Sequence, residues 1–335
     1  MSIAPAQSGV EIASAAAGTM LLSIRDLSVV YRSDGADVKA VEDFNLDLRA
    51  GDVVGIIGES GSGKTTAIRA MVGLLPAAAT VTSGAIHFCG DPVFGNGRDR
   101  LHDIRGSEIG MIFQSASASI NPLFRIGWQL KELMRAHGRW TDASWKELAT
   151  LLSRLGLRDP DRVLRSYPHQ LSGGMLQRAA IALAVATSPR IVVADECTSA
   201  LDVTTQAEVI EVLRTLVGRD RGLIYVTHDL LLASEICSSL VVMYAGQVVE
   251  HGDTESVLTR PRHPYTRALL AAVPKWCGKM RLRGIEGLPP IVTDGWRGCV
   301  FAPRCPEVHD GCRDRPIPWT GDPGDGFRCV RRSIG

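Results

Sequence analysis

Short β-branched runs alternate with longer helix-like segments from Leu21 to about Gly252. The candidate strands are Leu22–Ile24, Val53–Ile57, Ile109–Phe113, Ile191–Ala194, Leu223–Val226, Leu240–Tyr244 and Gln247–Glu250. Alternation of this kind is typical of an α/β fold in which helices cover both faces of a largely parallel sheet. We therefore expect one α/β domain over residues 21–260.

The strand pattern disappears between Gln114 and Leu183. Apolar residues there recur with helical spacing in three segments, 127–136, 144–154 and 175–186. Repeats at intervals of three and four residues place apolar side chains on one face of a helix. The sequence therefore predicts a helical subdomain, about residues 115–186, inserted into the α/β core.

The two ends of the chain differ in composition from residues 21–260 and lack their alternating pattern of strands and helices. Residues 261–335 are rich in proline and contain few strand or helix runs, so we expect a separate, loop-rich extension with little apolar surface of its own. Residues 1–20 are small and polar and lack a basic start followed by an apolar block. They are predicted to be a disordered leader rather than a secretory signal.

Composition limits the possible partners. Apolar residues make up 45% of the chain and charged residues 22%, which is typical of a globular protein. A formal net charge of +1 provides no surplus of Lys and Arg for phosphate backbones, so no nucleic-acid partner is expected. The chain also lacks a run of about eighteen apolar residues, the length that a membrane-spanning helix needs.

A glycine-rich loop follows the buried strand at 53–57 and leads into a helix. Its residues are Gly58, Glu59, Ser60, Gly61, Ser62, Gly63, Lys64 and Thr65, followed by Thr66. This is the GxxxxGK[ST] pattern in a strand, loop and helix context, which disfavours a simple glycine turn without a ligand. Its backbone N–H groups would bind phosphates. Lys64 would contact the β- and γ-phosphates, and Thr65 would ligate Mg²⁺.

Two adjacent acids end another buried strand, at 191–194. Open α/β sheets bind ligands at the carboxyl ends of their strands. Asp195 would hold Mg²⁺ through its water shell, and Glu196 would act as the base for water attack on the γ-phosphate. Adjacent acids at a strand end are otherwise often a solvated edge, but the upstream phosphate loop disfavours that alternative.

A third motif, Leu171-Ser172-Gly173-Gly174-Met175, opens a helix between the phosphate loop and the acidic strand end. With these motifs in this order, the chain resembles the nucleotide-binding subunits of ABC transporters. The resemblance implies a P-loop core related to RecA, with an antiparallel β-subdomain and a helical subdomain. It also implies a head-to-tail pair, in which Ser172, Gly173 and Gly174 contact the ATP held by the partner.

The resemblance assigns roles to four further residues. Tyr31 would stack on adenine, although an aromatic residue in a strand core is the alternative. Gln114 would sense Mg²⁺ and the attacking water, and His228 would contact the γ-phosphate and orient Glu196. A histidine after a strand is otherwise usually a surface residue. Asp202 ends a loop through which paired nucleotide sites communicate. Because both Glu196 and His228 are present, we expect this chain to hydrolyse ATP.

Three stretches resemble the ATPases of oligopeptide and dipeptide importers, a branch that includes nickel and some oligosaccharide systems. They are Ser119–Pro122, Tyr167–Gln170 and Arg262–Leu270. The resemblance implies two transmembrane permease subunits, and either a second homologous ATPase or a second copy of this chain. It also implies an extracytoplasmic solute-binding protein and a position at the cytoplasmic face of the membrane. The alternative, a non-transport ABC ATPase, usually carries two cassettes or a coiled-coil arm.

Four cysteines, Cys299, Cys305, Cys312 and Cys329, crowd the end of the chain. Four thiolates could bind Zn²⁺ or an iron–sulfur cluster. The paired CxxC spacing of structural zinc sites is absent, and the family resemblance implies a [4Fe-4S] cluster. Zinc remains an alternative, as do unliganded or disulfide-bonded cysteines. A bound metal would stabilise a segment that lacks a core.

Overall fold

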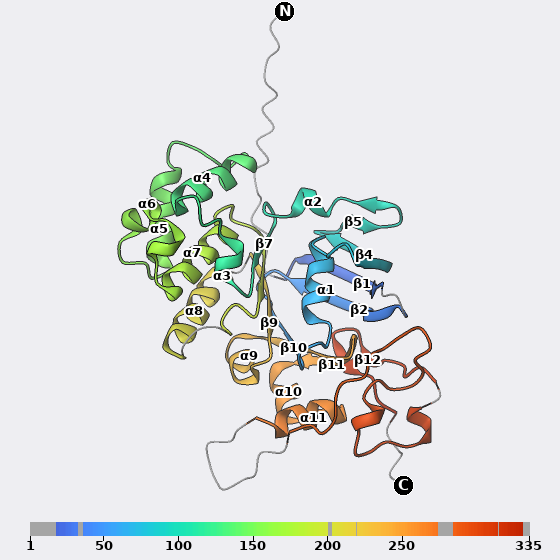
Figure 1. Cartoon of the computed structure of the whole chain (residues 1–335). Helices are drawn as coiled ribbons and strands as arrows, with labels where there is room; N and C mark the ends of the chain where they lie inside the picture. The colour runs from blue at the N-terminus through green and yellow to red at the C-terminus, as the bar shows by residue number, and fades with distance from the viewer. Residues whose placement is uncertain are drawn as a thin grey trace, which may run out of the picture.

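The computed structural model describes residues 18–32, 36–199, 203–218, 220–273, 284–313 and 315–330. The predicted leader therefore lies almost wholly outside the described residues. Within them the fold is mixed α/β, as predicted, and one long sheet runs through it. Figure 1 shows the helices between residues 116 and 216 on one side of the sheet's central strands, the antiparallel strands between residues 20 and 95 on the other side, and the C-terminal extension beneath them.

The centre of the sheet is parallel and deeply buried. Its strands are β3 (Val53–Ile57), β7 (Ile109–Ile112), β8 (Ile191–Asp195), β9 (Gly222–Thr227) and β10 (Ser239–Tyr244), with β11 (Gln247–Asp253) antiparallel to β10. Strands covered on both faces are apolar throughout, which is why their β-branched runs stand out in the sequence. The strands predicted in these positions are confirmed.

The second half of the sheet is antiparallel and borders the first. It consists of β1 (Met20–Tyr31), β2 (Val38–Arg49), β4 (Ala79–Phe88), β5 (Asp91–Gly95) and β6 (Arg98–Asp99). The β-branched runs in the sequence predicted only Leu22–Ile24 of β1, and they did not predict β2 or β4. In β2 the buried residues alternate with more accessible ones, so no continuous apolar run marks the strand.

The helical subdomain lies between β7 and β8. Its elements are α3 (Ala116–Ser119), α4 (Ile126–Ala136), α5 (Ser144–Arg154), α6 (Pro160–Arg165), η1 (Pro168–Gln170) and α7 (Gly173–Val185). The predicted helical segments coincide with α4, α5 and α7. Leu130, Leu148 and Leu152 are fully or almost fully buried between these helices, as their spacing predicts.

The remaining helices flank the sheet. They are α1 (Lys64–Met71), α2 (Leu101–Ile104), α8 (Val203–Leu216), α9 (Leu230–Ile236), α10 (Thr254–Thr259) and α11 (Pro264–Ala271). Among the described residues, none of the helices combines the length and the apolar character that crossing a membrane requires.

The C-terminal extension is not separate from the core, so that expectation is wrong. It contributes α11, η2 (Ala302–Arg304), η3 (Asp310–Cys312), β12 (Thr320–Asp322) and β13 (Asp325–Phe327). β13 pairs with β11 of the main sheet, and Val300 and Phe301 are buried in the cassette's own core. Val300 and Phe301 are thus buried against the cassette instead of forming a separate core.

Candidate functional site

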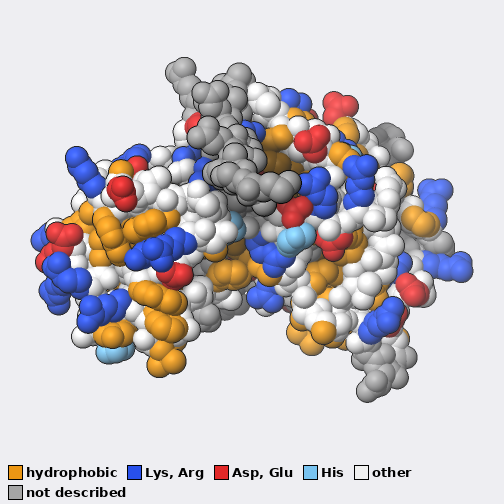
Figure 2. Space-filling model, turned by 90° about the horizontal axis from the view of Figure 1, so that it is seen from above, with side chains coloured by type: hydrophobic (Ala, Val, Ile, Leu, Met, Phe, Trp, Pro, Cys, Tyr) orange, Lys and Arg blue, Asp and Glu red, His pale blue; other side chains and the backbone are white. Residues whose placement is uncertain are grey.

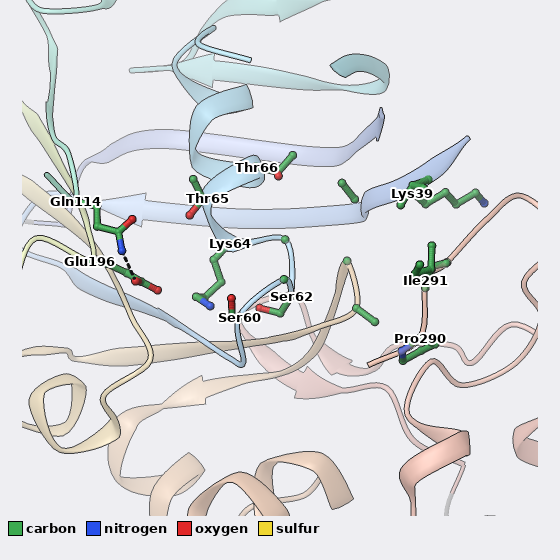
Figure 3. Close-up of a pocket in the computed structure, with 17 residues that line it drawn as sticks. Lys39, Ser60, Ser62, Lys64, Thr65, Thr66, Gln114, Glu196, Pro290 and Ile291 are labelled. Carbon is green, nitrogen blue, oxygen red and sulfur yellow. Dashed lines mark hydrogen bonds between the residues drawn. The ribbon is translucent and has the colours of Figure 1, made fainter. Parts of the chain in front are cut away.

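An elongated pocket of about 360 Å³ opens beside the glycine-rich loop. One end is lined by the loop, Gln114 and Glu196, which lie together in Figure 3. The opposite end is lined by the start of β2 and by residues 290–292 of the C-terminal extension. The predicted phosphate-binding residues Ser60, Gly61, Ser62, Gly63, Lys64, Thr65 and Thr66 all line this pocket.

Glycine is required at two positions of the loop. Gly58 has φ +153° and Gly63 has φ +99°, and a Cβ atom at either would lie 2.2–2.3 Å from a backbone oxygen of Met243 or Ala40. Residues with a side chain are excluded from such conformations and contacts. The glycines therefore let the loop pack closely against the neighbouring backbone.

Lys64 lies inside the curve of this loop. Its Nζ donates hydrogen bonds of 2.9 Å to the carbonyl oxygens of Gly58 and Glu59, and the residue is only 4% exposed. Burial lowers the pKa of Lys64, opposed by the nearby carboxylates of Glu196 and Asp195. A desolvated ammonium group at this position is suited to binding phosphate oxygens.

Thr65, which lines the pocket, is hydrogen-bonded to Asp195. The Thr65 hydroxyl donates to Asp195 Oδ1 over 3.2 Å, although the two residues lie on α1 and β8. Asp195 is 3% exposed, and burial raises its pKa, while the hydrogen bond from Thr65 opposes that rise. A hydroxyl and a carboxylate side by side are oxygen donors of the kind that Mg²⁺ prefers, so the residues present fit this ion.

Two further predicted residues, Gln114 and His228, lie close to the Glu196 carboxylate. Gln114 Nε2 donates to Glu196 Oε2 over 3.1 Å, and His228 Nδ1 lies 3.5 Å from Glu196 Oε1. Glu196 adopts φ +43°, a left-handed conformation that is unfavourable for a residue with a side chain. Such strain is often retained where a side chain must be aimed at a reacting group. The three residues are thus brought together beside the phosphate loop.

Other predicted residues lie elsewhere. Ser172 caps α7, where its hydroxyl accepts a 3.4 Å hydrogen bond from the Met175 N–H. Ser172, Gly173 and Gly174 are not among the residues that line the pocket. Tyr31 is half-buried at the end of β1 and does not line the pocket, although its cross-strand partner Val38 does. Asp202 lies outside the described residues.

The structure adds contacts to the phosphate loop that the sequence analysis missed. Both carboxylate oxygens of Glu59 accept hydrogen bonds from Arg304 of the extension, at 2.7 and 3.2 Å. The Tyr265 hydroxyl accepts the Glu59 N–H at 2.9 Å, and Arg304 also donates to the Tyr244 hydroxyl. Burial alone would lower the pKa of Arg304, but its hydrogen bonds to Glu59 and Tyr244 raise it above the ordinary value. Tyr265 belongs to the Arg262–Leu270 stretch, and this stretch was the one feature of the sequence that pointed to a role for the extension near the loop.

The four C-terminal cysteines line a second cavity, of about 570 Å³. The pKa of Cys299 is raised to about 11, mainly by burial and in smaller part by the neighbouring thiols of Cys305, Cys312 and Cys329. Among the described residues, no group of three or more His, Cys, Asp or Glu side chains is arranged to hold a metal ion. The thiols therefore surround one cavity, but they are not positioned as a set of ligands.

Comparison with known proteins places these sites in a family. Residues 41–199 match the family model described as ABC transporter, and residues 249–312 match the oligopeptide/dipeptide transporter, C-terminal region. The chain is 41% identical over 296 residues to the dipeptide transport ATP-binding protein DppD of Escherichia coli K12, covering 88% of this chain and 90% of the relative. It is 38% identical over 314 residues to the oligopeptide transport ATP-binding protein OppD of the same organism, covering 93% of each.

Solved structures give the same result. The ATP-binding cassette MJ0796, a dimer in a post-hydrolysis state bound to ADP and Pi, matches with a TM-score of 0.61 and 25% identity. This match covers 70% of the present chain and 99% of the cassette. The cbiO1 protein from Clostridium perfringens, part of an ABC transporter complex, has the same fold, with a TM-score of 0.60 and 24% identity. The chain therefore belongs to the ABC transporter ATPases, in the oligopeptide/dipeptide transporter family.

Proposed function

We propose that this chain is the ATP-hydrolysing subunit that energises an importer of oligopeptides, dipeptides or similar solutes. The observation that carries the proposal is the convergence of Gln114 and His228 on Glu196, beside the Thr65–Asp195 pair. The substrate class is supported by the DppD and OppD relatives, which match most of the chain.

In this proposal each side chain of the site has a separate role in ATP hydrolysis. Lys64 and the loop amides bind the β- and γ-phosphates, and Thr65 and Asp195 hold Mg²⁺, which neutralises charge on the phosphate oxygens. Glu196 accepts the proton of the attacking water, and His228 holds Glu196 in place and contacts the γ-phosphate. Gln114 positions the same water from the opposite side. These assignments account for why six polar residues from four segments of the chain lie close together.

Hydrolysis requires a second cassette in this proposal. Ser172, Gly173 and Gly174 lie at an exposed helix N-terminus, away from the chain's own pocket, where their N–H groups are available to a γ-phosphate held by a partner. The partner is a homologous ATPase or a second copy of this chain, arranged head to tail. Asp202 belongs to the loop that would link the two nucleotide sites.

The helical subdomain is the proposed contact with two transmembrane permease subunits at the cytoplasmic face of the membrane. Large apolar side chains are exposed on it, at Leu123, Phe124, Trp128 and Trp145. Figure 2 shows hydrophobic side chains on this lobe interspersed with Lys and Arg. Exposed apolar groups of this size mark interaction surfaces. Solute choice would then be made by the permeases and an extracytoplasmic solute-binding protein.

The four cysteines are proposed to hold a [4Fe-4S] cluster, with Zn²⁺ as the alternative. Four thiols around one cavity are the donor set that either group uses. Metal and sulfide analysis of anaerobically purified protein separates these possibilities, with Cys312→Ser as the variant and Cys89→Ser as the matched control. Iron with equimolar sulfide, lost only in Cys312→Ser, is expected. Zinc without sulfide would identify the alternative, and absence of both would refute a metal site.

Transport itself is tested by affinity purification from native membranes in mild detergent, followed by reconstitution into vesicles. We expect two multi-spanning proteins and a second ATPase to co-purify, and ATP to drive peptide uptake that Glu196→Gln abolishes. Uptake of nickel or an oligosaccharide instead would reassign the solute within the same family. Recovery with only non-membrane partners would favour a non-transport ABC ATPase.

A further inference from the structure

The phosphate chemistry does not use the end of the pocket opposite Glu196. Its walls are Val38, Lys39 and Ala40 of β2 and Pro290, Ile291 and Val292 of the C-terminal extension, so apolar residues predominate there. In Figure 3, Ile291 and Pro290 lie at the far side of the phosphate loop from Gln114 and Glu196. One wall of the pocket is therefore supplied by a segment outside the cassette.

This wall is fixed in position by backbone pairing. Val38 forms an antiparallel bridge with Thr293, and the Lys39 N–H donates to the Val292 carbonyl oxygen over 2.8 Å. The Lys39 ammonium lies 3.7 Å from the Asp294 carboxylate. The segment that carries Ile291 is thus attached to the first residues of β2, so its distance from the phosphate loop is set by the sheet.

Ile291 is 71% exposed at this wall. A large aliphatic side chain gains free energy when apolar surface of a ligand covers it. ATP, the ligand of the proposed function, carries its polar triphosphate at one end and at the other a planar adenine, whose ring faces accept contact with apolar side chains. A nucleotide whose phosphates lie on the loop projects its base toward the other end of the pocket.

We propose that Pro290 and Ile291 of the C-terminal extension contact the adenine base of bound ATP. The proposal rests on the proposed ATPase function and adds a binding determinant from outside the cassette. Tyr31, which is expected to stack on adenine, pairs in register with Val38, so it is next to this end of the pocket. The base is then held between the β1–β2 edge and the extension.

The role predicted for Ile291 is ground-state binding, which has a distinctive kinetic signature. A contact to the base is made equally in the Michaelis complex and in the transition state, so its loss raises KM and leaves kcat unchanged. It also leaves the binding of a ligand without a base unaffected. A contact that merely supported the fold would not discriminate between ligands in this way.

Isothermal titration of the purified full-length chain with Mg–ATP and with Mg–tripolyphosphate tests the proposal. We compare Ile291→Ser with the matched control Leu288→Ser, because Leu288 is also highly exposed, at 87%, and does not line the pocket. Ile291→Ser is expected to weaken ATP binding about fivefold, which corresponds to loss of part of one side chain's burial. Tripolyphosphate binding should not change, and Ile291→Val should bind ATP like the original chain.

Three other results of the titration would overturn the proposed contact between Ile291 and the base. Equal loss of ATP and tripolyphosphate affinity in Ile291→Ser, or unchanged ATP affinity, would overturn the base contact. Equal effects of Ile291→Ser and Leu288→Ser would do the same. Failure of the proposed function is separate, because it would appear as ATP binding that Lys64→Ala does not weaken.

Discussion

The phosphate site and the four-cysteine cavity lie in the same chain but are built in different ways. In the phosphate site, side chains from α1, β8 and the segment after β7 already meet through hydrogen bonds, because parallel strands end at one edge of the sheet. In the cysteine cavity, loops bring four thiols around one space without arranging them as ligands. A site held by the sheet is preorganised, whereas a site held by loops depends on its ligand for geometry.

The largest effect on ATP affinity within this comparison is expected at Lys64. Replacing Lys64 by Ala removes a buried charge-assisted donor from the phosphates, so we expect ATP affinity to fall about 100-fold or more. Titration of purified protein with Mg–ATP measures it. The surface variant Lys146→Ala is the control. Near-normal ATP binding by Lys64→Ala would mean that the preorganised loop is not the phosphate site.

Glu196→Gln separates binding from chemistry. The amide keeps the size of the side chain but cannot accept the water proton, so we expect turnover to fall about 100- to 1,000-fold. ATP affinity should change by no more than about twofold, since the role proposed for Glu196 is contact with the attacking water and not with the phosphates. Steady-state hydrolysis and nucleotide titration test both statements. A variant with normal turnover would remove Glu196 from the mechanism.

Arg304→Gln tests whether the extension helps to preorganise the phosphate loop. The substitution leaves the Glu59 carboxylate without its bidentate partner and loosens the loop, so we expect KM for ATP to rise about tenfold with kcat nearly constant. Arg304→Lys should restore part of the affinity. Arg267→Gln, which breaks an exposed ion pair with Glu307 in the same extension, is the matched control. Equal effects of the two glutamine variants would contradict a specific role.

The smallest effect concerns His251, which lies on β11 beside β13 of the extension. Burial lowers its pKa, opposed by a hydrogen bond to the Pro323 backbone and by Asp325 and Asp47, while Arg262 lowers it further. The His251 imidazole therefore binds a proton more readily in the unfolded chain than in the folded protein. The free energy of unfolding consequently falls as the pH drops through about 6.5, the pKa of this imidazole in the unfolded chain. We expect acidification from about pH 7.5 to 5.5 to lower the thermal midpoint about 2 °C more in the original chain than in His251→Gln.

The sequence predicted the parts of the molecule whose local pattern determines their place. The buried runs of β3 and β8 and the glycine spacing of the loop predicted that Lys64, Thr65 and Asp195 lie at one edge of the sheet, and in the structure a hydrogen bond joins Thr65 to Asp195. The sequence did not reveal the contact between Arg304 and Glu59, because it joins residues 245 positions apart and neither belongs to a repeating pattern. The wall at Ile291 was missed for the same reason, and so was the burial of Phe301 in the cassette core.

The most direct test of this account is a structure of the Glu196→Gln chain with Mg–ATP bound. We predict the triphosphate on residues 58–65, Mg²⁺ beside Thr65 and Asp195, and the adenine against Ile291 of the extension. A nucleotide bound in another place would contradict the site as a whole. Phosphates on the loop with the base turned away from Ile291 would contradict the claim that the extension completes the ATP pocket.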